Sequence, residues 1–176
     1  MRVSALELPE VLLLESDASG DDRGTFSRWW DGATLAESGA DPHVDQISLS
    51  TNRLGGTLRG IHFQAEPFGE AKTVRCIRGS AFDVAVDLRT DSPNRNRWVA
   101  RELSATNGLA LYVPKGFGHA FLTLEDDTAL LYVIATPYRV DAARGYRWND
   151  PTIGIVWPKP VVVISDRDQT WPLIGR

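Results

Sequence analysis

The sequence predicts an all-β fold built mainly from antiparallel strands, and three observations support this. Short alternating or apolar runs recur roughly ten times, which is typical of a β-sandwich or barrel. Turn signals rich in glycine and proline separate these runs, for example at residues 53–56, 66–69 and 114–116. The one convincing helical pattern, within residues 32–38, is too short to cover a parallel sheet.

The strands are expected where each run lies between turns. In chain order these are residues 11–14, 44–50, 57–63, 73–77, 81–88, 98–103, 110–113, 120–124, 129–135 and 161–164. The clearest is 81–88, where alternate residues from Phe82 to Leu88 form an apolar face and Asp83 and Asp87 lie on the other. This second face either meets solvent or lines a polar cavity, and the alternation leaves both open.

Composition indicates an ordinary globular protein of one domain, residues 1–176, with 43% hydrophobic and 24% charged residues. The formal net charge of -4 argues against a general nucleic-acid or membrane-surface binder. A single cysteine, Cys76, cannot form an internal disulfide, and no secretion signal or apolar run of about 20 residues is visible. These features favour a cytoplasmic protein without a membrane partner.

Residues 57–64 contain an arginine and a histidine three positions apart in an expected strand. Side chains alternate along a strand, so Arg59 and His62 belong to opposite faces. Both can serve one pocket only if the strand bulges or bends, and Gly60 between them permits this. The sequence therefore predicts an irregularity at Gly60.

A histidine after a proline and glycine turn adds a second signal. His119 follows Pro114 and Gly116 with a spacing that resembles the second motif of the cupin jelly rolls. Metal-binding cupins carry two histidines in their first motif, whereas here His62 is followed by Gln64. A transition-metal site needs three or four ligands, so we expect a cavity with no metal and no organic cofactor.

Further motifs in order strengthen the resemblance. They are residues 21–24, 57–62, 71–75, 82–89 with Ser92 and Pro93, 103–104, 114–121, Tyr132 with Tyr138, 147–151, 155–158 and 165–168. From about residue 10 onward the chain resembles the dTDP-4-dehydrorhamnose 3,5-epimerase family. Its members are cupin-type jelly rolls that act on nucleotide-linked 4-keto-6-deoxy sugars, which implies the same fold and a homodimer here.

The resemblance implies a set of catalytic residues. A proton next to a C4 ketone leaves as an enolate forms, so the enzyme needs a base, an acid on the opposite ring face and a group that stabilises the oxygen. By resemblance His62 is the base and Asp168 holds its tautomer. Tyr132 returns a proton from the other face, and Lys72 stabilises the enolate oxygen.

The resemblance also implies substrate-binding residues. Arg59 and Arg23 would hold the pyrophosphate, with Arg23 reaching the partner's site because a family dimer exchanges N-terminal strands. The other implied binding residues are Phe26, Gln46, Ser48, Asp83, His119 and Tyr138. At position 28 the family has a glutamate that contacts the nucleobase, whereas Arg28 can only donate hydrogen bonds.

Structural alternatives exist for single residues. His62 could be a satisfied strand residue, Asp168 a turn residue and Lys72 a solvated strand edge, while Tyr132 could be a core aromatic. In function, the alternatives are a ketoisomerase or dehydratase of the same fold, or a sugar-nucleotide-binding cupin without catalysis. Whether C3, C5 or both carbons are inverted stays open at this point.

Overall fold

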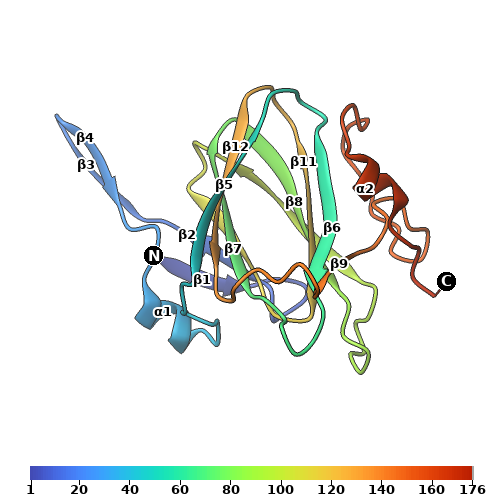
Figure 1. Cartoon of the computed structure of the whole chain (residues 1–176). Coiled ribbons are helices and arrows are strands. Elements are labelled where there is room, and N and C mark those ends of the chain that lie inside the picture. Colours follow the sequence, from blue (N-terminus) through green and yellow to red (C-terminus); the bar gives the residue numbers. More distant parts are fainter. Residues whose placement is uncertain (176) are drawn as a thin grey trace.

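The computed structural model describes residues 1–175 and consists mainly of two antiparallel sheets that face each other (Figure 1). The six-stranded sheet runs in the order β1 (Arg2–Ala5), β2 (Leu12–Glu15), β10 (Leu109–Val113), β7 (Lys72–Arg78), β12 (Thr128–Ile134) and β5 (Gln46–Asn52). The five-stranded sheet runs β13 (Ala143–Gly145), β6 (Leu58–Gln64), β11 (Phe117–Thr123), β8 (Ser80–Asp87) and β9 (Trp98–Ser104). The predicted all-β fold is confirmed.

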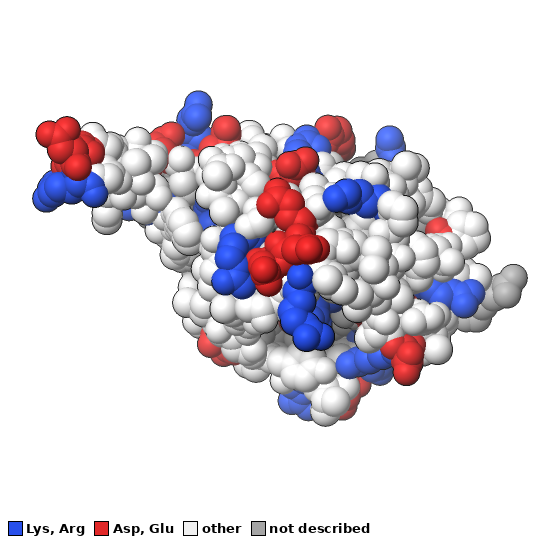
Figure 2. Space-filling view, turned by 90° about the horizontal axis from the view of Figure 1, so that it is seen from above, with Lys and Arg blue, Asp and Glu red and all other residues white. Residues whose placement is uncertain are grey.

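A two-stranded hairpin and two short helices lie outside the two sheets. Strands β3 (Ala18–Asp21) and β4 (Gly24–Ser27) form a hairpin that projects away from the body, with charged side chains at its tip (Figures 1 and 2). Helix α1 (Gly32–Glu37) follows it, and α2 (Asp166–Thr170) lies near the C-terminus. Within residues 1–175 no helix is long and apolar enough to cross a membrane.

The prediction of a strand at residues 161–164 is wrong. Only Val163 forms an isolated parallel bridge, to Thr57, and Val162 and Val163 are exposed. Pro158 and Pro160 lack the N–H groups that a longer ladder would need. The segment instead lies along the start of β6, where the Val163 carbonyl accepts from Leu58 N at 2.8 Å.

Strand β8 is buried on both faces, which decides the alternative left open above. Asp83 and Asp87 are completely buried, so the acidic face points into the molecule. The apolar face, with Val84 and Val86, is covered by the C-terminal segment through Ile153 and neighbouring aromatic residues. Both faces of β8 are therefore interior, and the two aspartates share their face with Ala81 and Ala85 of a hydrophobic cluster.

The predicted irregularity at Gly60 is confirmed. On β11, His119 pairs with His62 while Phe121 pairs with Arg59, so the register shifts between them. Gly60 has φ +124, and a Cβ there would lie 2.5 Å from the Ala120 Cβ. The shift turns Arg59 and His62 toward the same cavity.

Candidate active site

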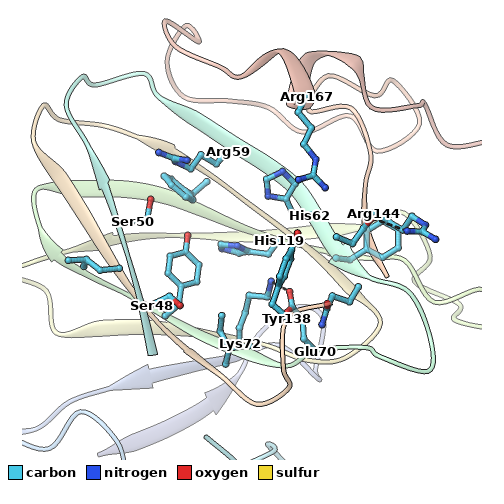
Figure 3. A pocket seen from close by; sticks show the side chains of 17 residues that line it. Ser48, Ser50, Arg59, His62, Glu70, Lys72, His119, Tyr138, Arg144 and Arg167 are labelled. Carbon is cyan, nitrogen blue, oxygen red and sulfur yellow. Dashed lines mark hydrogen bonds and ion pairs between the residues drawn. The ribbon is translucent and has the colours of Figure 1, made fainter. Parts of the chain in front are cut away.

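A cavity of about 330 Å³ opens between the two sheets. Arg59, His62 and His119 come from the five-stranded sheet, whereas Ser48, Lys72 and Tyr132 come from the facing six-stranded sheet. The remaining lining residues are Leu49, Ser50, Phe63, Gln64, Glu70, Phe121, Ile134, Tyr138, Ala143, Arg144 and Arg167 (Figure 3). A molecule bound here is thus contacted from opposite walls.

His62 forms a close pair with Asp168. Its Nε2 lies 2.6 Å from Asp168 Oδ1, and the imidazole side chain is 42% exposed toward the cavity. Asp168 is buried in α2, where its carboxylate also accepts from Gly60 N at 3.2 Å and Trp171 Nε1 at 3.3 Å. Burial alone would raise the pKa of Asp168, but these hydrogen bonds and the His62 ring outweigh burial and lower it.

A second histidine and carboxylate lie deeper. His119 Nε2 lies 2.8 Å from Asp83 Oδ1, and both side chains are buried. The His119 ring meets the Tyr132 ring edge-on, with centroids 5.7 Å apart. Burial, followed by the nearby Asp83 charge, raises the pKa of Tyr132 well above its usual value, so its hydroxyl stays protonated at neutral pH.

Lys72 lies at the start of β7 and contacts an acidic neighbour. Its Nζ lies 2.5 Å from Glu70 Oε1, and the two side chains are 8% and 11% exposed. A buried ammonium needs such a compensating charge. The pair lies across the cavity from His62 in Figure 3.

Several arginines surround the cavity. Arg59 Nε donates to Asn52 Oδ1 at 3.0 Å, which anchors its guanidinium near the start of β6. Arg167 stacks on Trp171 at 4.9 Å and extends from α2 toward His62, and Arg144 lies on β13 (Figure 3). These cations can bind phosphate oxygens with planar forks.

Comparison with known proteins identifies the family of the chain. The model of the dTDP-4-dehydrorhamnose 3,5-epimerase family matches residues 5–175. The chain belongs to this epimerase family. Among curated members, the dTDP-4-dehydrorhamnose 3,5-epimerase of Sinorhizobium fredii is 44% identical over 173 residues, which covers 98% of this chain and 89% of the relative.

Two solved structures show how closely the fold agrees with this family. The Bacillus anthracis 3,5-epimerase with TDP and PPi bound superposes with a TM-score of 0.94 at 37% identity, covering 98% of this chain and 99% of that one. A 3'-monoepimerase from Streptomyces bikiniensis, solved with dTDP-quinovose, has a TM-score of 0.88 at 34% identity, covering 97% and 86%. The solved structures similar to this chain therefore include a monoepimerase as well as a 3,5-epimerase.

Not every predicted site residue of this family member lines the cavity. Asp83 and Asp168 lie one layer behind, each paired with a histidine that does. Gln46, at the start of β5, is half-buried outside the cavity wall. Arg23 and Phe26 lie on the projecting hairpin, where Arg23 pairs with Asp21 and Phe26 is 76% exposed.

Several cavity residues were missed by sequence reasoning: Gln64, Glu70, Arg144 and Arg167. Arg167 precedes Asp168 directly, and Glu70 stands two positions before Lys72, so proximity to a motif was the available signal. Arg144 gave no signal, since it lies on a three-residue strand that no alternation predicts.

A larger hollow of about 580 Å³ lies beyond Phe63, beside the loop of residues 88–94. Its one arginine, Arg89, is already paired with Asp87 and Glu10. Within residues 1–175 no three histidine, cysteine, aspartate or glutamate side chains come together as possible metal ligands. The smaller cavity holds the histidines, Tyr132 and Lys72, so it is the candidate active site.

Proposed function

We propose that this epimerase inverts C3, C5 or both in a dTDP-linked 4-keto-6-deoxy sugar, as a step of deoxysugar biosynthesis. The main support for this proposal is that His62 and Tyr132 line one cavity from its two facing sheets. A sugar ring between them is met by a base on one face and an acid on the other. Inversion of a carbon requires this arrangement.

His62 is the base in this proposal. An ionised Asp168 can only accept hydrogen bonds, so Nε2 of His62 carries a proton, and in the neutral imidazole that acts as the base Nδ1 keeps a lone pair. Nδ1 takes the proton from the carbon next to the C4 ketone. The C–H electron pair becomes part of a carbon–carbon double bond, and the C4 oxygen gains the negative charge.

Lys72 and Tyr132 complete the reaction. Lys72 donates a hydrogen bond to the enolate oxygen while Glu70 balances its charge in the buried site. Tyr132 then gives its proton to the opposite face of the carbon, and its raised pKa keeps it in the protonated, donating form. No organic cofactor or metal is required for these proton transfers.

The nucleotide end is held by cations. Arg59 and Arg167, at the cavity mouth, bind the pyrophosphate, with Ser48 and Tyr138 beside the rest of the substrate. His119, held by Asp83, binds a sugar hydroxyl. Gln46 and Phe26 contact the nucleoside in the assembled dimer described next.

The working form in this proposal is a homodimer of single-domain subunits. Strand β5 ends the six-stranded sheet, and its residue Ile47, which does not line the cavity, is 66% exposed. An apolar edge strand of this kind is normally covered. A second copy would cover it and would bring the hairpin with Arg23 to the neighbouring cavity. The single cysteine and a nucleotide-linked substrate favour action in the cytoplasm.

The test is incubation with dTDP-4-keto-6-deoxyglucose in deuterated water, followed by NMR. Deuterium is expected at C3, C5 or both, with inverted configuration. The absence of exchange at both carbons, with other 4-keto nucleotides also inert, would contradict the proposal. His62→Asn should abolish exchange and leave dTDP affinity nearly unchanged, which separates chemistry from binding.

The same spectra address the alternatives. A ketoisomerase would move the carbonyl to another carbon, and a dehydratase would eliminate water. Both reactions change which carbons carry carbonyl or hydroxyl groups, whereas epimerisation changes only the configuration. A sugar-nucleotide-binding protein without catalysis would bind dTDP and show no exchange. The facing positions of His62 and Tyr132 favour epimerisation over both.

A further inference from the structure

Gln64 has every polar atom of its side-chain amide engaged. It ends β6, two residues after His62, and is 5% exposed. Its Nε2 donates to the carbonyls of Phe68 at 3.1 Å and Pro137 at 3.2 Å. Its Oε1 accepts from the Arg139 backbone N–H at 2.6 Å. The amide thus joins two loops that lie on either side of the strand end.

The contacts to Pro137 and Arg139 bracket Tyr138. Tyr138 lines the cavity, is 56% exposed and stands in the irregular segment between β12 and β13. Within residues 1–175, Tyr138 itself makes no hydrogen bond through its backbone or its side chain. Its place at the cavity is therefore set by the peptides on either side, and Gln64 binds both of them.

We propose that Gln64 is a positioning residue that holds Tyr138 in place beside the substrate. Only an amide of this length combines two donors with an acceptor at one strand end. Glutamate would bring a negative oxygen against two carbonyls, and methionine would leave both carbonyls and the Arg139 N–H without a partner. The role thus depends on the amide group and not on the volume of the side chain.

The same amide links Tyr138 to the Lys72 side of the cavity. Phe68, whose carbonyl it binds, lies in the loop that leads to Glu70 and Lys72. The Arg139 guanidinium stacks on the Phe68 ring at 4.3 Å, which fastens the two loops a second time. A shift of one loop is therefore transmitted to the other.

For activity this inference rests on the proposed function. Gln64→Met should lower kcat/KM for sugar inversion by about 10- to 100-fold, since an error of about 1 Å in placing a contact has effects of this size. The variant Gln64→Met/Tyr138→Ala should lose clearly less activity than the product of the two single losses, because both changes remove the Tyr138 contact. Gln169→Met, on the exposed surface of α2, is the matched control and should behave as wild type.

A second measurement does not depend on activity. The chain has four tyrosines, so incorporation of 3-fluorotyrosine yields four fluorine NMR signals, and Tyr138→Phe assigns one of them. In Gln64→Met, and equally in Gln64→Glu if methionine prevents folding, the Tyr138 signal should move toward that of free 3-fluorotyrosine while the others stay in place. An unchanged Tyr138 signal, or additive losses in the double variant, would overturn the inference. If the wild type proved inactive on every 4-keto nucleotide, the fluorine spectra would still show whether Gln64 positions Tyr138.

Discussion

Tyr132 offers the sharpest test at the scale of single residues. With Tyr132→Phe, His62 can still remove a proton and return a deuteron to the same ring face, but the hydroxyl that donates to the opposite ring face is gone. Deuterium incorporation should therefore continue with retained configuration, while inversion falls by about 10²- to 10⁴-fold. NMR of the recovered sugar nucleotide measures both. Inversion at the wild-type rate would remove Tyr132 as the acid.

Asp168 makes a prediction about pH. Because its folded pKa is lowered, the carboxylate contributes stability that is present above its unfolded pKa of about 3.9 and is lost as pH falls through the folded value. In urea titrations the acid-side loss of stability should be smaller in Asp168→Asn than in the wild type, because other carboxylates with lowered pKa values, such as Asp87, remain in both. The substitution should also slow exchange about 10²- to 10⁴-fold, because a neutral amide in place of the carboxylate no longer fixes the His62 tautomer.

The pairing of His62 with Asp168 shows what can be predicted from sequence at this scale. The residues are 106 positions apart, so no local sequence pattern connects them. Only the resemblance to the ordered motifs of the family predicted that they pair. Gln64 and Glu70 were missed for a different reason. Their contacts depend on how loops fold back on β6 and β7, and periodicity carries no information about irregular backbone.

At the scale of elements, the bulge in β6 is the feature to test. Gly60→Ala would force a Cβ to 2.5 Å from the Ala120 Cβ and 2.7 Å from the His119 carbonyl, at a φ that side chains rarely adopt. We expect a loss of about 2–6 kcal/mol in the free energy of unfolding, from backbone strain together with overpacking. Chemical denaturation measures it.

Gly24 supplies the control for this prediction. It has φ +127, close to that of Gly60, yet a Cβ there would meet nothing within 4 Å. Gly24→Ala should therefore lose only the strain, about 1–3 kcal/mol. Equal losses at the two positions would show that the close approach of β6 to β11 is not what requires glycine.

The element scale also shows where sequence patterns succeed and fail. The run 81–88 is long and alternates strongly, and it forms β8, an interior strand of the five-stranded sheet. Strands β1, β3, β4 and β13 have three or four residues each, too few for a period of two to stand out. Residues 161–164 fail for the opposite reason, since their β-branched composition suggests a strand that the neighbouring prolines prevent.

For the whole molecule, the exposed edge strand makes a prediction about assembly. If a second copy covers the outward face of β5, Ile47→Glu should weaken dimerisation by about 10- to 100-fold, as expected for one buried aliphatic side chain. Val156→Glu, at a residue that is 74% exposed in the C-terminal segment, is the matched control. Sedimentation velocity over a range of concentrations reports both. A monomeric wild type would rule out this assembly.

Exchange of hairpins between subunits makes a stronger prediction, because each active site would then need a residue from the partner subunit. Arg23 is 89% exposed in its side chain, lies in the turn between β3 and β4, and does not line the cavity of its own chain. If it serves the partner's site, Arg23→Glu and His62→Asn proteins are each inactive for different reasons. Unfolding them together and refolding the mixture should produce heterodimers with one site that has both residues intact, about a quarter of all sites for random pairing. Inversion activity should return to that fraction of the wild-type value. No recovery, with heterodimers confirmed by mass spectrometry, would place Arg23 outside the partner's site.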